Sequence, residues 1–216
     1  MNLRQSEIDR LLQVSSPALG VQLSAKDVVR ELGDAYDALA SLLEARNGLY
    51  AFHRALHVFP LHSNGQEQGL IEWNIPTVWR AGYPYPPASG VFFAENIFGS
   101  PFWTEGRHVC LMEDETGELN VYADSLEEWL YRVLSEDDAE VGRNLARNWS
   151  AAHGELLSGQ RLAPKMPFLL QEQGSELALS SFYAANTLQL MRFRGDLATQ
   201  LKDIPDGTKI QVKVIP

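Results

Sequence analysis

The sequence has very little cysteine and no long apolar run. Cys110 is its only cysteine, so the chain cannot form an internal disulfide, which fits a reducing cytoplasm. No stretch approaches the roughly eighteen consecutive apolar residues of a membrane helix, and the first residues, MNLRQSEIDR, have no apolar run after their charges. We therefore expect a cytoplasmic protein without a membrane span or a secretory signal.

Basic residues are also scarce. The 216 residues include 18 Lys and Arg against 28 Asp and Glu, for a net charge of −10 at pH 7. Residues 1–135 hold 9 basic and 18 acidic side chains, so nearly all of the excess lies there. This sign argues against direct nucleic acid binding. It leaves open a basic protein partner, or an acidic surface that only maintains solubility.

Short enzyme motifs are missing as well. The sequence contains no glycine-rich phosphate loop, nucleophile elbow, paired-cysteine zinc site or metalloprotease helix motif. His53 and His57 have a spacing that can place two imidazoles on one face of a helix, but no third ligand stands nearby. Cys110 lies between apolar neighbours, as a buried thiol does. We predict no catalytic, cofactor-binding or metal-binding residues.

Apolar periodicity predicts a helix over residues 24–46, with Ser24 as its N-cap, followed by short apolar segments, a short helix and a Tyr/Pro loop up to residue 89. The segment GVFFAENIFGSPFW, residues 90–103, begins with a strand that is apolar on both faces and is therefore central in its sheet. Turns at Glu105-Gly106 and Thr116-Gly117 then separate further strands. The prediction is an antiparallel meander.

Ser125 and Glu128 have capping-box spacing, which predicts a helix that packs on the meander. A second amphipathic helix is expected over residues 136–154, and LLSGQRLAPKMP reads as a linker. Strands near 167–170 and 181–184, a helix over 188–201 and a strand over 209–215 follow. We predict an α+β fold with helices on one side of the sheet, a domain over 1–155 and an extension over 156–216 packed on the same core.

Five residues are candidates for contacts with a partner. Glu95 is the one charge inside the apolar stretch, where a carboxylate serves either as a catalytic acid or, more often, as a cap for a turn. Trp103 stands beside an exposed turn. Glu113, Asp114 and Glu118 belong to EDETGE, which reads as a solvated hairpin tip, an acidic knob that faces a partner, or a metal loop.

Several segments together resemble the SUKH superfamily, which includes the yeast Smi/Knr-type regulators of cell-wall glucan synthesis and many bacterial toxin-immunity proteins. The matching segments are ARNGLYAF, IEWNIPTVWR, and VFFAENIFGSPFW running into LMEDETGELNVYADSLEEWL, within residues 25–135. The resemblance implies that Phe92, Phe93 and Phe98 are scaffold.

For function, the resemblance implies a binding protein that neutralises a polymorphic toxin by occluding it. The acidic front half agrees with a nuclease toxin that has a basic cleft. The alternatives are a regulatory scaffold, as the yeast relatives suggest, and an enzyme that relies on Glu95 and the two histidines.

Overall fold

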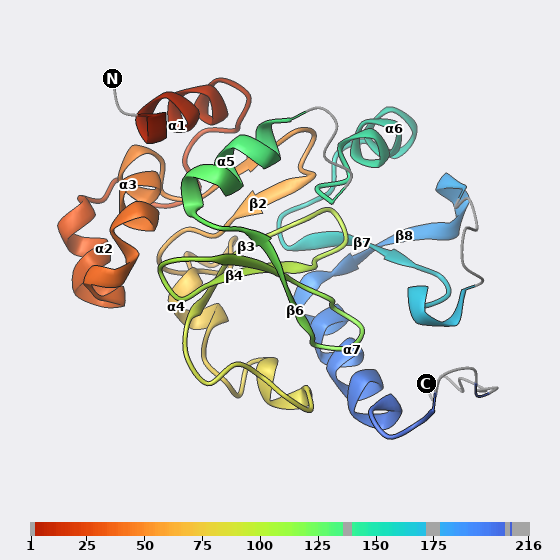
Figure 1. Cartoon of the computed structure of the whole chain (residues 1–216). Coiled ribbons are helices and arrows are strands. Elements are labelled where there is room, and N and C mark those ends of the chain that lie inside the picture. The colour runs from red at the N-terminus through yellow and green to blue at the C-terminus, as the bar shows by residue number, and fades with distance from the viewer. Residues whose placement is uncertain (1–2, 136–139, 172–177, 206–207, 209–216) are drawn as a thin grey trace.

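The computed structural model describes residues 3–135, 140–171, 178–205 and 208 of the chain. Six strands form an antiparallel sheet in which spatial order equals sequence order, so the predicted meander is confirmed (Figure 1). These strands are β1 (Leu49–Ala51), β2 (Leu56–Val58), β3 (Val91–Glu95), β4 (Pro101–Thr104), β5 (Val109–Met112) and β6 (Leu119–Ala123). With a separate two-stranded sheet and several helices, the fold is α+β.

The apolar strand β3 is an inner strand of this sheet, as its two apolar faces predict. Phe92 and Phe93 are fully buried and point to opposite faces, because successive side chains of a strand alternate. Phe93 packs against Trp129, with ring centroids 5.0 Å apart, whereas Phe92 packs against Trp79 at 4.9 Å. Both faces of the sheet are therefore covered.

The helices and 3-10 turns of residues 3–153 include those two covers. They are α1 (Leu3–Gln13), α2 (Ala25–Leu32), η1 (Asp34–Tyr36), α3 (Asp37–Ala45), α4 (Leu70–Trp73), η2 (Arg80–Gly82), α5 (Leu126–Leu134) and α6 (Arg143–His153). Helix α5, contacted by α1 and α3, lies over one face, and α4 with η2 lies over the other (Figure 1). The expectation of helices on one side is therefore wrong, because residues 70–73, within an expected short apolar segment, form α4 on the second face.

The long helix expected over residues 24–46 is divided. Ser24 caps α2 through a capping box with Asp27, as predicted. The helix ends at Leu32, since Gly33 has a φ of 101°, a conformation that a helix does not contain. A short turn, η1, then leads into α3. This break lets two short helices lie beside the sheet instead of one long helix.

The last part of the chain packs beside the meander. It contains β7 (Gln160–Pro164), η3 (Phe168–Leu170), η4 (Leu179–Ser181), β8 (Phe182–Asn186) and α7 (Thr187–Leu201). Strands β7 and β8 pair antiparallel, and α7 runs below them (Figure 1). Leu162, Phe182 and Met191 join the same buried cluster as the meander.

Two expectations for this part are wrong. The presumed linker contains β7, and residues 168–170 form a 3-10 turn rather than a strand. Gly159 precedes β7 and Pro164 is its last residue, so this segment has the composition of a linker. Pairing with β8 nevertheless holds it extended. The helix expected over 188–201 is confirmed as α7, and the strand near 181–184 as β8. The strand expected over 209–215 lies outside the described residues.

Among the helices that the structure describes, none combines the length and the apolar character needed to cross a membrane.

Candidate functional site

The five candidate residues divide between the interior and the surface. Glu95 is 0% exposed, Asp114 is 2% exposed and Trp103 is 9% exposed. Glu113 and Glu118 are exposed. The expectation that Glu95, Trp103 and Asp114 offer surface contacts to a partner is therefore wrong, whereas Glu113 and Glu118 remain accessible.

Glu95 ends β3 and connects the meander to the last part of the chain. Its carboxylate forms an ion pair with Arg161 of β7 at 2.8 Å and accepts a hydrogen bond of 2.8 Å from the Thr187 hydroxyl at the start of α7. Glu95 therefore does not cap a turn. Burial alone raises the pKa of this carboxyl, but Arg161, His57 and Thr187 outweigh that effect and hold the pKa below its usual value. Glu95 is thus ionised at neutral pH.

His57 lies opposite Glu95 in the register of β2 and β3. Burial lowers the pKa of His57, so its imidazole is neutral at neutral pH. Its Nδ1 lies 3.0 Å from a Glu95 oxygen, and because that carboxylate is ionised, Nδ1 carries the hydrogen and donates it. His53 stands in the β1–β2 turn. The two histidines therefore do not share a helix face.

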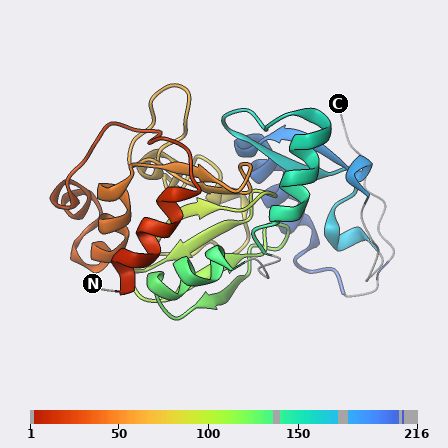
Figure 2. The ribbon, with the colours of Figure 1, turned by 90° about the horizontal axis from the view of Figure 1, so that it is seen from above.

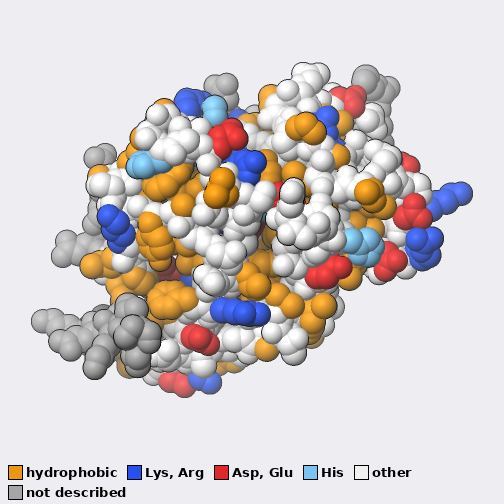
Figure 3. Space-filling model, turned by 180° about the vertical axis from the view of Figure 1, so that it is seen from behind, with side chains coloured by type: hydrophobic (Ala, Val, Ile, Leu, Met, Phe, Trp, Pro, Cys, Tyr) orange, Lys and Arg blue, Asp and Glu red, His pale blue; other side chains and the backbone are white. Residues whose placement is uncertain are grey.

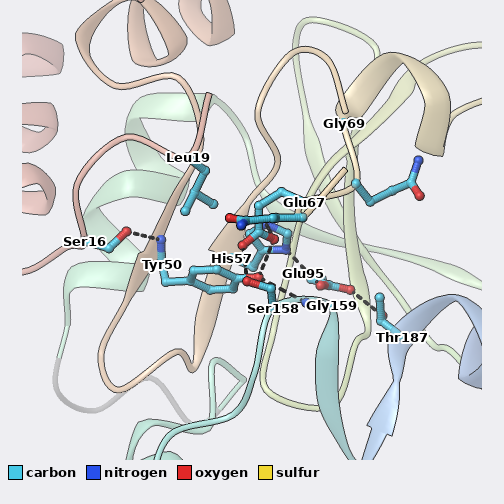
Figure 4. Close-up of polar contacts among 12 residues, drawn as sticks. Ser16, Leu19, Tyr50, His57, Glu67, Gly69, Glu95, Ser158, Gly159 and Thr187 are labelled. Carbon is cyan, nitrogen blue, oxygen red and sulfur yellow. Dashed lines mark hydrogen bonds and ion pairs between the residues drawn. The ribbon is translucent and has the colours of Figure 1, made fainter. Parts of the chain in front are cut away.

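Glu67 extends these contacts toward the surface. It accepts hydrogen bonds of 2.8 Å from the Tyr50 hydroxyl and 2.5 Å from the Ser158 hydroxyl, and Ser158 is exposed. His57 Nε2 lies 4.0 Å from the nearest Glu67 oxygen. We call the set the Glu95 cluster, most of which Figure 4 shows converging from the strands and from the last part of the chain: Tyr50, His57, Glu67, Glu95, Ser158, Arg161 and Thr187.

A second buried ion pair holds the acidic turn between β5 and β6. Asp114 lies 2.9 Å from Arg194 of α7 and accepts a 2.6 Å hydrogen bond from the Ser100 hydroxyl. Burial raises the pKa of Asp114 more than Arg194 and Ser100 lower it. Glu115 accepts hydrogen bonds from the backbone N–H groups of Phe168 and Leu169. The expectation that EDETGE is a solvated tip is therefore wrong for Asp114 and Glu115, which are buried.

Trp103 is part of the scaffold. Its indole Nε1 donates a 3.1 Å hydrogen bond to the carbonyl of Ser89. The ring packs on Gly90, which has a φ of 81°, and a Cβ at that position would come within 2.4 Å of the indole. Only glycine permits this approach.

An open groove remains beside the accessible Glu113. The groove lies between α5 and the β5–β6 hairpin and has a volume of about 570 Å³. Val121 and Tyr131 in its lining are 67% and 63% exposed. The other lining residues are Leu111, Asn120, Tyr122, Arg132, Ser135 and Glu140. Apolar, aromatic and acidic groups thus meet at one surface site.

Figure 3 shows the face of the molecule opposite to that of Figure 1. Apolar side chains gather on the side where α7 lies. Among the residues that the figure colours, the acidic and basic side chains of this face are scattered and form no single patch (Figure 3). Exposed large apolar side chains of this part of the sequence include Met166, Leu169 and Phe193.

Sequence reasoning missed the residues that hold the buried carboxylates. The sequence pattern places Arg161 in a linker and gives Arg194 and Thr187 no role. Residues 160–164, Gln-Arg-Leu-Ala-Pro, do not alternate between polar and apolar side chains, and a proline is uncommon within a strand, so no local signal reveals β7. Tyr131 follows from the amphipathic pattern of α5 as an outward-facing residue, but nothing local marks it as part of a groove.

No family model matches the chain, and no curated protein matches it. The crystal structure of Atu4351 from Agrobacterium tumefaciens is similar in fold, with a TM-score of 0.58 and 12% sequence identity over 87% of each chain. At this identity the likeness concerns the fold alone.

Proposed function

We propose that this protein is a non-enzymatic binding module that neutralises a polymorphic toxin by direct contact, and that a nuclease with a basic cleft is the toxin class that fits best. The resemblance to the SUKH superfamily supports the proposal. Its matching segments correspond to the end of α3 with β1, the α4 region, the β3–β4 pair, and β5, β6 and α5. They therefore include five of the six strands of the meander, all but β2, together with α4 and α5.

The acidic surface of this part carries the proposal. Of the 18 carboxylates in residues 1–135, the buried ones are Glu67, Glu95, Asp114 and Glu115. The buried side chains that the structure describes in that segment include none of its 9 basic residues. An excess of carboxylates therefore remains outside the core, where it attracts a basic protein and repels nucleic acid.

The burial of the acid–base groups supports a binding role over an enzymatic one. His57 and Glu95, the pair best suited to proton transfer, are 1% and 0% exposed. A general acid or base must come within hydrogen-bond distance of its substrate. A substrate would reach these groups only after β7 and α7 had moved away from the sheet.

Affinity capture of the tagged protein from its native cell tests the proposal. The captured proteins are compared with those encoded by the open reading frames adjacent to its gene. We expect one co-encoded basic protein, held in a one-to-one complex that weakens as salt screens the attraction. Expression of this protein together with the captured one should restore growth that the captured protein alone inhibits. Several weakly held partners without any effect on growth would contradict toxin neutralisation and favour the regulatory scaffold.

A further inference from the structure

We propose that the groove between α5 and the β5–β6 hairpin binds an arginine side chain presented by the protein partner. The proposal rests on the proposed function for the nature of that partner as a basic protein. The preference of the groove for a guanidinium group can be tested without the partner.

The shape of the groove suits one long side chain with its flanking backbone. Its volume of about 570 Å³ lies within the range of roughly 300–1,000 Å³ that is typical of ligand sites. Leu111 is half-buried and supplies an apolar surface, and Tyr131 presents its ring from α5. Figure 2 shows α5 lying along the green strands of the hairpin, so the groove has a helix on one side and a sheet edge on the other.

Glu113 places a carboxylate at one point of the groove lining. Partial burial raises the pKa of Glu113, and repulsion from the negative charges of Asp114, Glu115 and Glu140 raises it further, whereas Arg194 lowers it. No ion pair joins Glu113 to a cation of the described residues. A positive group in the groove would relieve this repulsion.

The cations nearest to Glu113 are committed to other groups. Arg194 pairs with Asp114 at 2.9 Å and donates a hydrogen bond of 2.7 Å to the Phe98 carbonyl. Arg132, which lines the groove, donates hydrogen bonds of 2.7 and 3.0 Å to Glu128. These two arginines therefore do not pair with Glu113, and a cation from a partner would find this carboxylate available.

Arginine suits this site better than lysine. A guanidinium group can form two parallel hydrogen bonds with a carboxylate while its flat face stacks on an aromatic ring. The exposed ring of Tyr131 supplies such a face. Within the groove an arginine already lies near an aromatic ring, since the Arg132 guanidinium is 5.5 Å from the centre of the Tyr122 ring.

The test uses the peptide acetyl-Gly-Gly-Arg-Gly-Gly-amide, titrated into the isotope-labelled full-length protein and followed by NMR. We expect shifts at the amides of Glu113, Asn120, Val121 and Tyr131. The same peptide with citrulline in place of arginine keeps the shape but lacks the charge, and it should bind at least about threefold more weakly. A lysine peptide should fall between the two.

Matched variants locate the interaction. Glu113→Gln should weaken arginine-peptide binding by about threefold to fivefold, as the loss of one exposed ion pair does. Glu118→Gln removes an exposed carboxylate from the same hairpin but outside the groove lining, and binding should stay unchanged. Amide spectra of both variants confirm that the fold is retained.

Equal binding of the citrulline peptide, equal weakening by the two variants, or shifts confined to another face would each overturn the proposal. The arginine preference of the groove and the neutralisation of a toxin can be contradicted separately. A toxin that is neutralised normally while the groove ignores arginine contradicts the groove alone. Selective arginine binding without any captured toxin contradicts the proposed function alone.

Discussion

The guanidinium of Arg161 lies 2.8 Å from the carboxylate of Glu95, and both side chains are 0% exposed. These two residues belong to different sheets, β7 and the meander. A buried charge without a partner is very unfavourable, so the meander and the last part of the chain depend on each other electrostatically. The Arg194–Asp114 pair repeats this arrangement between the middle of α7 and the β5–β6 turn.

Replacement of Arg161 should be strongly destabilising. Arg161→Met leaves Glu95 buried without its cation, and we expect the free energy of unfolding to fall by about 3–5 kcal/mol in urea titrations. The double variant Glu95→Gln/Arg161→Met should recover at least about half of that loss, since neither charge is then left alone. Arg30→Met is the control, because its ion pair with Asp27 is exposed. A loss in Arg161→Met no larger than in the control would contradict the coupling.

The carboxylates of the acidic turn should differ sharply in their contribution to stability. Asp114→Asn removes the partner of the buried Arg194, and we expect a loss of about 3 kcal/mol in the free energy of unfolding. Glu118→Gln changes an exposed side chain of the same turn and should cost less than about 0.5 kcal/mol. Urea midpoints measure both. Equal effects of the two substitutions would show that the whole turn is solvated. Because Asp114 is expected to stabilise the fold, a charge-reversal test of binding should leave it unchanged.

Stability should depend on pH through His57. Burial lowers the pKa of His57 in the folded state, so the unfolded chain takes up this proton first as the pH falls. The free energy of unfolding should therefore decrease below about pH 6.5, by at most about 1.4 kcal/mol per pH unit. The pKa of Glu95 is also lowered, so its contribution is lost only at more acidic pH, below its ordinary value of about 4.3.

Urea titrations at pH 7.5, 6.5 and 5.5 isolate this effect. The slope of stability against pH should decrease in His57→Gln and stay as in the wild type in His53→Gln, whose side chain is exposed. An unchanged slope in His57→Gln would contradict the assignment of a neutral His57.

Phe93 in β3 and Phe98 in the turn between β3 and β4 should also differ in their contribution to stability. Phe93 is fully buried against Trp129, and Phe93→Ala should cost about 3–5 kcal/mol. Phe98 is only half-buried, where it contacts Phe168 and Phe182, so Phe98→Ala should cost about 1–3 kcal/mol. Thermal unfolding that ranks Phe98→Ala above Phe93→Ala would contradict this assignment.

The meander could be predicted because its signals are local. The two apolar faces of β3, the hairpin turns and the serine caps of α2 and α5 each depend on residues within a few positions of one another. Strand β7 could not be predicted in the same way. Its extended form depends on pairing with β8, about twenty residues further along the chain, and its own composition is that of a linker.

The candidate site was predicted only in part, for a related reason. Four carboxylates in EDETGE look alike in sequence, yet Asp114 turns inward to Arg194 and Glu113 stays at the surface. The arginine that makes this difference stands 80 positions later in the chain. Local pattern therefore identifies acidic residues without telling which of them are already neutralised.

A titration of the captured toxin's activity against this protein tests the central claim most directly. Neutralisation by binding predicts that activity falls linearly and ends at one equivalent of protein, independently of the time of incubation. Loss of activity that becomes complete with far less than one equivalent, and that increases with time, would contradict the account, because it would mean that the protein inactivates the toxin as an enzyme.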